Sequence, residues 1–424
     1  MTGPATLNAG AEMSERDALA VLVAVEGVGP IALARMLGRL GSARQILEVA
    51  QRGAAAIPAL IAASAPEAGD GRSMPGAVAA ALVSAADAAP AILADIRDSG
   101  LTVIALGEPG YPPRLAAIAT PPHVLFVHGN AAALLGTRSL AIVGTRRPTI
   151  GGRMTASRIA AALSRAGATI VSGLAVGIDG AAHAAVVAEG GSTVAVIAGG
   201  HRHLFPSGHR ALADAIVAGG GAVVSEHPPG SQPNRGTFPR RNRIISGLAD
   251  AVIVVEAGAR SGALTTAAWA LEQGRGCYLV PGAIDAPMSA GCLAFLRECA
   301  GEARIVAGVP QLLEDLGIAV PEPRRQPSAR PSTTPPPSAH PEPPSPDALL
   351  NGLPPATRRT ADAVLAGFAT ADELVAVTDL PIAAVLSALT VLEIRGLVAG
   401  TYGRYHPAGS LMRAGPAKVP DRLR

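Results

Sequence analysis

Short apolar runs alternate with helical patterns across residues 101–320. Each run is four to six residues long and is followed by a glycine-containing turn and then by apolar positions at helical spacing. The predicted strands are Leu140–Val143, Thr169–Ser172, Thr193–Ala198, Ala222–Ser225, Val252–Val255 and Cys277–Val280, and the predicted helices are 152–166, 180–189, 208–218, 239–248 and 263–273. Near-continuous apolar strands are typical of a parallel sheet with helices on both faces. The pattern therefore predicts an α/β fold with a Rossmann-like parallel sheet.

The first part of the chain has a different pattern. Residues 1–100 predict an N-terminal helical module with an alanine-rich insertion. Within it the turn Glu26–Pro30 joins two short helices, as in helix-hairpin-helix or SAM-like modules, and the glycines allow a close approach. We expect this turn to be structural, although its amides would suit a phosphate.

The last part of the chain predicts a linker and a second small domain. Eleven of the 26 residues in 321–346 are proline, which favours an extended segment without a core. In 347–424 the helical patterns Asp372–Val377 and Pro381–Glu393 precede a hairpin pattern at 396–405. This order predicts a winged-helix domain with a C-terminal tail.

Composition narrows the class of protein. Hydrophobic residues make up 49% of the 424 residues, charged residues 16% and aromatic residues only 2%, a globular balance with an aliphatic core. Lys418 is the single lysine, so arginine supplies almost all positive charge. Cys277, Cys292 and Cys299 form no C-x-x-C pair, which argues against a disulfide framework or a zinc site. We see no secretory signal or membrane segment, and expect a cytoplasmic protein.

Two predicted strands end in turns that suit anions. The first is followed by Gly144, Thr145, Arg146 and Arg147, where a dinucleotide-binding turn would carry three spaced glycines instead. Arginine binds phosphate oxygens in bidentate fashion, so this turn fits a phosphodiester better than a buried dinucleotide.

The second strand ends at Ser172 and Gly173, whose hydroxyl and amide groups also suit a phosphate. We expect Asp179 beyond them to cap the helix that starts at Gly180, and His183 to be a packing residue.

Two helix starts downstream add basic and aromatic groups. The first carries Phe238, Arg240, Arg241, Asn242 and Arg243, and the second opens at Ser261 and Gly262. Arginine beside an aromatic ring suits single-stranded nucleic acid, because every base offers a face for stacking. The alternatives are a solvated basic helix face for the arginines and a buried core position for Phe238.

Motifs of several enzyme classes are missing. The sequence has no G-x-x-x-x-G-K-[ST], no G-x-S-x-G and no H-E-x-x-H, and it shows no paired carboxylates. His201, His203 and His209 lie near one another in sequence but lack a carboxylate or cysteine at ligand spacing. We therefore expect no metal and no cofactor.

The ordered motifs resemble the DNA-processing protein A (DprA/Smf) family over roughly residues 105–310. The motifs are Tyr111-Pro112-x-x-Leu115, Pro121-Pro122-x-x-Leu125-Phe126-x-x-Gly129, Ala141–Arg146, Ser172–Asp179, Arg241–Leu248, Val254–Ala257, Ser261-Gly262 and Pro281-Gly282. The resemblance implies a non-enzymatic, dimeric protein that binds and protects single-stranded DNA in natural transformation and loads the RecA recombinase. Carried over by position, its DNA-binding residues are Gly144, Thr145, Arg146, Ser172, Gly173, Phe238, Arg240, Asn242, Arg243 and Ser261; the strand-end argument adds Arg147, Arg241 and Gly262.

The chain departs from the family pattern in places. The usual Tyr-Pro after the third strand reads Phe205-Pro206, and Leu293 and Cys299 replace an asparagine and a glycine in a late motif. If that late segment shapes the dimer, its details differ here.

Two other functions stay open. A nucleotide phosphoribohydrolase of the LOG type would need a P-G-G-x-G-T-x-x-E turn, which is absent. A transcription regulator would read bases with helix Pro381–Glu393, whose outward positions hold almost no Arg, Lys, Asn or Gln. We expect that helix to contact protein, or DNA only weakly.

Overall fold

The computed structural model forms two compact units, Met1–Arg325 and Gln326–Arg424. The residues that it describes are 13–66, 72–318, 350, 352–401, 404–408 and 411. The predicted proline-rich linker 321–346 lies outside the described residues, as does Gly403 in the predicted hairpin.

A nine-stranded mixed sheet runs through the first unit in the order β1-β2-β6-β5-β4-β3-β7-β8-β9. The strands are β1 Thr102–Ala105, β2 Val124–Gly129, β3 Ser139–Val143, β4 Thr169–Ser172, β5 Thr193–Val196, β6 Ala222–Ser225, β7 Ala251–Val254, β8 Gly276–Leu279 and β9 Ala303–Ile305. The six predicted strands are all present, with ends within two residues of the expected ones. The Rossmann-like architecture is confirmed.

One edge of this sheet corrects the prediction of a purely parallel sheet. β1 pairs antiparallel with β2, and β2 pairs antiparallel with β6, whereas β3 to β9 pair in parallel. The connection between β1 and β2 holds turns, prolines and the four-residue helix α7 Pro113–Ala116. It therefore lacks the long helix that follows the strands predicted from the sequence.

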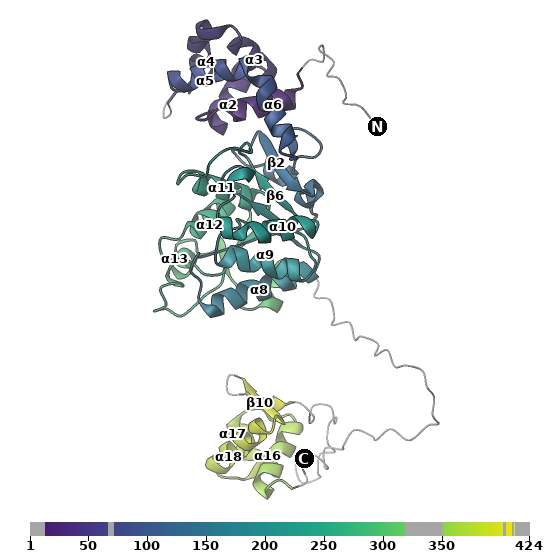
Figure 1. Cartoon of the computed structure of the whole chain (residues 1–424). Coiled ribbons are helices and arrows are strands. Elements are labelled where there is room, and N and C mark those ends of the chain that lie inside the picture. Colours follow the sequence, from purple (N-terminus) through teal and green to yellow (C-terminus); the bar gives the residue numbers. More distant parts are fainter. Residues whose placement is uncertain are drawn as a thin grey trace, which may run out of the picture. The chain divides into compact units, whose positions relative to one another are not determined.

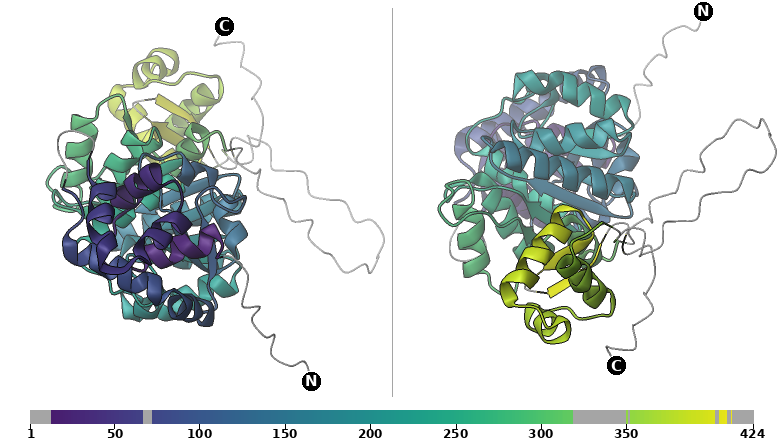
Figure 2. Two further views of the ribbon diagram at one scale, coloured as in Figure 1. Left: turned by 90° about the horizontal axis from the view of Figure 1, so that it is seen from above. Right: turned by 90° about the horizontal axis from the view of Figure 1, so that it is seen from below.

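Helices cover both faces of the sheet (Figures 1 and 2). One face carries α8 Ile150–Arg165, α9 Ile178–Ala188, α10 Arg210–Ala218 and α14 Val309–Asp315. The other carries α7, α11 Thr237–Gly247, α12 Gly262–Glu272 and α13 Ala290–Glu298. Strand residues alternate between the two layers, so that Leu140 and Ile142 pack toward α8 while Ala141 and Val143 pack toward the opposite cluster.

Within residues 13–66 and 72–100, the described part of the chain before the sheet, six helices pack together and onto the antiparallel edge of the sheet (Figure 1). They are α1 Glu15–Val23, α2 Pro30–Leu40, α3 Ala43–Ala50, α4 Ile57–Ser64, α5 Gly76–Asp87 and α6 Ala89–Asp98, with the 3₁₀ turn η1 Gly53–Ala56 before α4. Ser14 and Ser42 cap α1 and α3 by accepting a bond from the amide three residues on. Their core is continuous with Val124 and Phe126 of β2. This module and the sheet are therefore packed as one unit.

In its described residues, the second unit has three helices followed by a two-stranded antiparallel hairpin. Its elements are α16 Pro355–Leu365, α17 Ala371–Thr378, α18 Ile382–Ile394, β10 Val398–Thr401 and β11 Arg404–Pro407. Thr370 and Glu373 form a capping box at the start of α17. The two predicted helices are present, and α16 adds a helix that the pattern did not reveal.

Candidate nucleic-acid interface

A cavity of about 450 Å³ opens at the carboxyl ends of β3 and β7. The chain leaves β3 toward β4 on one side and later returns to β7 on the other, so the cavity lies at the point where the strand order reverses. Ligands of open α/β sheets bind at such a point. Its lining residues are Val143, Gly144, Thr145, Arg146, Arg147, Ala175, Asp179, Phe238, Pro239, Arg241, Asn242, Ile245, 258–263, Thr265, Thr266 and Met288.

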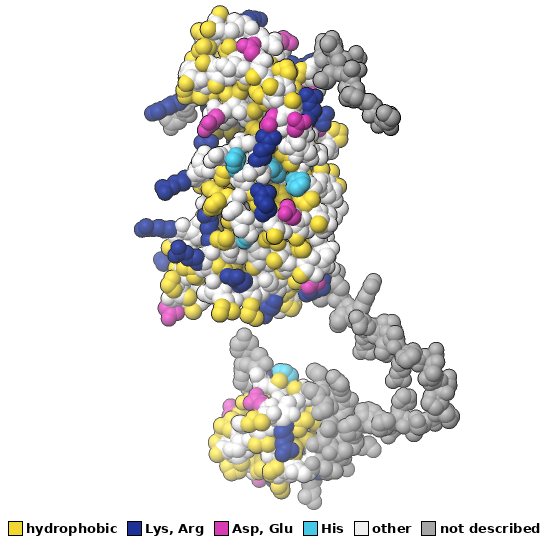
Figure 3. Space-filling model, in the orientation of Figure 1, with side chains coloured by type: hydrophobic (Ala, Val, Ile, Leu, Met, Phe, Trp, Pro, Cys, Tyr) yellow, Lys and Arg dark blue, Asp and Glu magenta, His cyan; other side chains and the backbone are white. Residues whose placement is uncertain are grey.

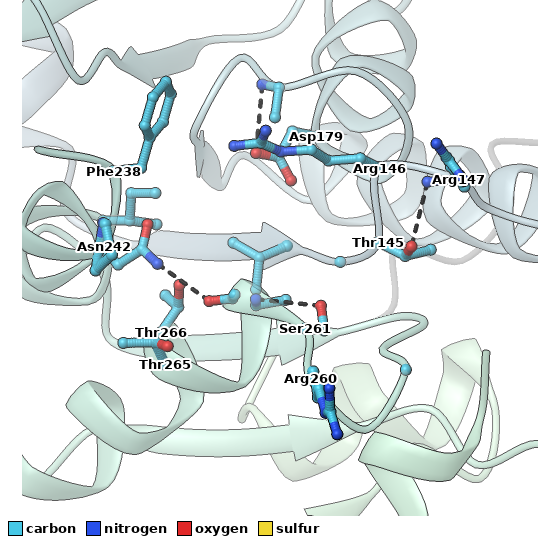
Figure 4. Close-up of a pocket in the computed structure, with 18 of the residues that line it drawn as sticks. Thr145, Arg146, Arg147, Asp179, Phe238, Asn242, Arg260, Ser261, Thr265 and Thr266 are labelled. Carbon is cyan, nitrogen blue, oxygen red and sulfur yellow. Dashed lines mark hydrogen bonds between the residues drawn. The ribbon is translucent and has the colours of Figure 1, made fainter. Parts of the chain in front are cut away.

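The turn after β3 is held by its backbone. The Thr145 amide donates to the Glu256 carbonyl at 2.7 Å, and the Thr145 carbonyl accepts from the Ile178 amide at 3.2 Å. A Cβ on Gly144 would lie 2.6 Å from a side-chain carbon of Ile178, so only glycine fits between these elements. This fixed turn presents Arg146 and Arg147 as exposed side chains at the cavity. Figure 4 shows Phe238 and Asn242 on one side of the cavity and Thr145 and Arg147 on the other.

The start of α12 forms a second wall. The Ser261 hydroxyl caps the helix by accepting from the Ala263 amide at 3.3 Å. No atom lies within 4 Å of the place a Cβ would occupy on Gly262, so a ligand can approach its backbone. Asn242 holds this helix start by donating from its Nδ2 to the Gly262 carbonyl at 3.1 Å. Nine of the thirteen predicted residues line the cavity: Gly144, Thr145, Arg146, Arg147, Phe238, Arg241, Asn242, Ser261 and Gly262.

Phe238 lies at the rim in contact with basic and aromatic groups. The Arg146 guanidinium carbon is 5.2 Å from the centre of its ring, a cation–π distance. The ring of Phe205 meets it edge to face, with centres 5.7 Å apart. Phe238 is half-buried and lines the cavity, so it does not fill the core position considered as its alternative.

The α8 N-terminus is closed to anions by a carboxylate. Glu256 accepts from the Thr149 amide at 2.9 Å and from the Thr149 hydroxyl at 2.6 Å. Thr149 in turn caps α8 by accepting from the Gly152 amide. The negative charge of Glu256 thus already satisfies the positive end of this helix dipole.

Asp179 and Arg241 are buried in the cavity wall. The position of each differs from the one that the sequence predicts. The cap residue of α9 is Gly177; Asp179 lies in the first turn and accepts from the amides of Gly173 and Ala175 at 3.2 and 3.4 Å. Arg241 donates to the carbonyls of Gly173 and Val196.

The titration of these two groups follows from their burial. Burial raises the pKa of Asp179, although Arg241 and the nearby amides oppose the shift. Burial lowers the pKa of Arg241 to about 10, so the guanidinium stays charged at neutral pH. Arg241 is therefore a buried charge behind the exposed arginines, not an exposed phosphate ligand.

Four predicted residues lie outside the cavity lining. The Ser172 hydroxyl is fully buried and donates to the Ile142 carbonyl at 2.5 Å. Gly173 is buried, and a Cβ there would collide with the Arg241 guanidinium. Arg243 is buried in a bidentate ion pair with Glu226, with bonds of 2.8 and 2.7 Å. Arg240 is exposed on α11 but is not among the residues that line the cavity.

Several residues of the cavity are not among those predicted from the sequence. Arg260 directly precedes the predicted Ser261 at the start of α12, Thr265 and Thr266 lie one turn into α12, and Met288 comes from the segment before α13. Spacing of four residues from Ser261 and Gly262 places the two threonines on the same helix face. This helical spacing is the signal by which the sequence could have identified the two threonines.

One histidine, His183, has a structural role. His183 is fully buried, its Nδ1 lies 2.7 Å from the Thr193 hydroxyl, and burial lowers its pKa to about 3. His183 is thus a packing residue, as predicted. Among the described residues, no group of three or more His, Cys, Asp and Glu side chains is placed to hold a metal ion.

The surface near the cavity is basic. Arg146, Arg147 and Arg260 are exposed, and within the described part of the chain no ion pair joins any of them to a carboxylate. Figure 3 shows arginine side chains projecting on the side of the domain where α11, α12 and α13 lie. No single helix among the described residues is both long and apolar enough to cross a membrane; two sharply bent helix pairs reach that length only together.

Comparison with known proteins identifies related chains. The family model for DNA recombination-mediator protein A matches residues 102–317. The chain is 43% identical over 209 residues to the DNA processing protein DprA of Bacillus subtilis, covering 49% of this chain and 70% of that protein. It is 39% identical over 287 residues to a putative DNA processing protein DprA of Mycobacterium tuberculosis, covering 66% of each. The X-ray structure of DNA processing protein A from Streptococcus pneumoniae matches with a TM-score of 0.59 and 29% identity, over 72% of this chain and 99% of that one.

Proposed function

The chain belongs to the DNA recombination-mediator protein A (DprA/Smf) family, and from this premise we propose that it binds single-stranded DNA at the cavity between β3 and β7. One observation carries the proposal: the exposed Arg146 guanidinium lies over the half-buried Phe238 ring at the cavity rim. A phosphodiester and a neighbouring base would find a cation and an aromatic face side by side there.

Single strands fit this site better than duplex. In a duplex the bases are stacked inside and paired, so the Phe238 ring could not reach a base face without unstacking it. The helix start at Ser261 and Gly262 offers free backbone for a phosphate within the same cavity. Neither feature reads base identity, which suits a protein that accepts DNA of any sequence.

Membership of the family supports a more specific proposal for the biological role, the oligomeric state and the accessory domains. We propose a role in DNA processing during natural transformation, in which a cytoplasmic homodimer protects the strand and loads the RecA recombinase. We also propose that α1 to α6 include a helix-hairpin-helix or SAM-like module and that the second unit is a winged helix. The exposed face of α18 carries Ile382 and Leu386 rather than base-reading side chains, which favours contact with protein.

A LOG-type phosphoribohydrolase is the enzymatic alternative, and the cavity does not favour it. Asp179 is the only carboxylate among the cavity-lining residues, and it is buried against two backbone amides. A general acid or base must reach the substrate within hydrogen-bond distance. We propose that the protein is not an enzyme; release of ribose phosphate from nucleoside monophosphates by the purified protein would contradict this.

Binding to single-stranded DNA should weaken as salt rises. The exposed arginines and the α12 start suggest three to five phosphate contacts, which predicts a slope of log affinity against log salt of about −2 to −4, at roughly −0.7 per contact. Anisotropy titrations of labelled oligo-dT at several salt concentrations would measure this slope. A flat response would mean that phosphates are not what the site binds.

Phe238→Ala should reduce affinity for oligo-dT while melting stays normal. Stacking on an aromatic ring is worth roughly 1–3 kcal/mol per base, and the partly exposed ring contributes little to the core. Phe238→Tyr keeps an aromatic face and should bind like the wild type. A large fall in melting temperature with undiminished affinity would show that the ring is a packing residue after all.

A further inference from the structure

Phe205 is an exposed aromatic ring next to the proposed site. It lies after β5, between the short 3₁₀ turns η3 His201–His203 and η4 Ser207–His209, and 52% of its surface is exposed. By contrast, the rings of Phe126 and Tyr278 lie in the core and are almost completely buried. Phe205 is also absent from the residues that line the cavity.

Exposure alone would not mark a binding residue, because Ile284 and Ile150 are exposed further still. The contacts of Phe205 distinguish it from them. Its ring meets Phe238 edge to face at 5.7 Å, with an angle of 71° between the planes. Arg146 lies over the same Phe238 ring at 5.2 Å. Phe238 thus joins Phe205 to the cation at the cavity.

The three side chains come from three different strand ends. Arg146 follows β3, Phe205 follows β5, and Phe238 begins α11 after β6. The parallel strands end at one edge of the sheet, so this edge carries a continuous path from the cavity across Phe238 to Phe205. Arg146 and Phe205 both contact Phe238. Of the two rings, Phe205 is the more exposed, because Phe238 is half-buried.

We propose that Phe205 is a second stacking position, which holds the nucleobase of a nucleotide adjacent to the one bound at the cavity. The inference rests on the proposed function, because it assigns a further residue to the same single strand. An exposed aromatic face accepts any base. The geometry therefore extends the site from the cavity along the sheet edge to Phe205.

The test compares Phe205→Leu with the wild-type full-length chain on two ligands of equal length: oligo-dT, and an abasic oligonucleotide with the same phosphodiester backbone. We expect Phe205→Leu to bind oligo-dT at least about 5-fold more weakly and the abasic strand equally well, since leucine keeps the apolar contact but cannot stack. Phe205→Trp should retain oligo-dT binding, and in a Trp269→Phe background its fluorescence should be quenched by the bases. Ile284→Ala is the control for an exposed apolar side chain elsewhere.

Wild-type affinity of Phe205→Leu for oligo-dT would overturn the inference and leave the proposed function standing. An equal loss on the abasic strand would also overturn it, because the residue would then act on the backbone or on the fold. Failure of the wild-type chain to bind oligo-dT is a different result, which removes the proposed function and this inference together.

Discussion

Replacing Arg243 by alanine is expected to destabilise the first unit, lowering its melting temperature by on the order of 10 °C. Four of the guanidinium N–H groups are in use: two donate to Glu226, one to the Thr120 carbonyl at 2.9 Å and one to the Arg240 carbonyl at 3.0 Å. Only 5% of the Arg243 side chain and 12% of the Glu226 side chain are exposed. Removing one partner of a buried pair leaves an unpaired charge and costs roughly 3–5 kcal/mol.

Arg240→Ala is the matched control, since Arg240 is an exposed arginine on the same helix. Its melting should stay within a degree or two of wild type, because exposed substitutions change stability little. Replacing both Arg243 and Glu226 with apolar residues of similar volume should recover much of the lost stability. Normal melting of Arg243→Ala together with lost DNA affinity would instead return Arg243 to the DNA-binding set that the sequence predicts.

Arg146→Ala is expected to weaken binding of oligo-dT by about 10-fold to 150-fold without changing the melting temperature. The guanidinium is exposed, so its loss leaves no buried charge behind. A hydrogen bond to a charged group is worth roughly 1.5–3 kcal/mol, and the contact over Phe238 would be lost as well. Anisotropy titration at fixed salt, with thermal melting of the same sample, measures both quantities.

Arg158→Ala removes the same charge from an exposed position on α8 that does not line the cavity. It controls for the general effect of net charge on binding to a polyanion. If Arg158→Ala and Arg146→Ala weakened binding equally, the interaction would be diffuse and the cavity would not be the site.

The repeating strand, turn and helix pattern was sufficient to predict the parallel part of the sheet. β4 and β6 begin and end where the apolar runs Thr169–Ser172 and Ala222–Ser225 predict. β1 and β2 were missed because their connection carries no long helix, so no periodicity marks them. β2 is instead buried on both faces: Val124 and Phe126 pack against the N-terminal helices, and Leu125 and Val127 belong to the core cluster on the other face.

The sequence located the cavity segments but not the orientation of each side chain. Arg240, Arg241 and Arg243 lie within four residues of one another, and sequence alone treats them as one basic cluster. On the helix, Arg240 is exposed, whereas Arg241 and Arg243 are buried against carbonyls and Glu226. Glu226 lies in the loop after β6, and no local pattern connects it with Arg243. Long-range partners of this kind decide whether an arginine is free to bind a phosphate.

We propose that the cavity between β3 and β7 binds single-stranded DNA through Arg146 and the groups around it. The most direct test is a competition titration, in which labelled oligo-dT bound to the full-length chain is displaced by unlabelled single strand or by duplex of the same length. We expect single strand to compete much more strongly than duplex, and we expect this preference to be lost in Arg146→Ala. Equal competition by both ligands, or a preference unchanged in Arg146→Ala, would contradict it.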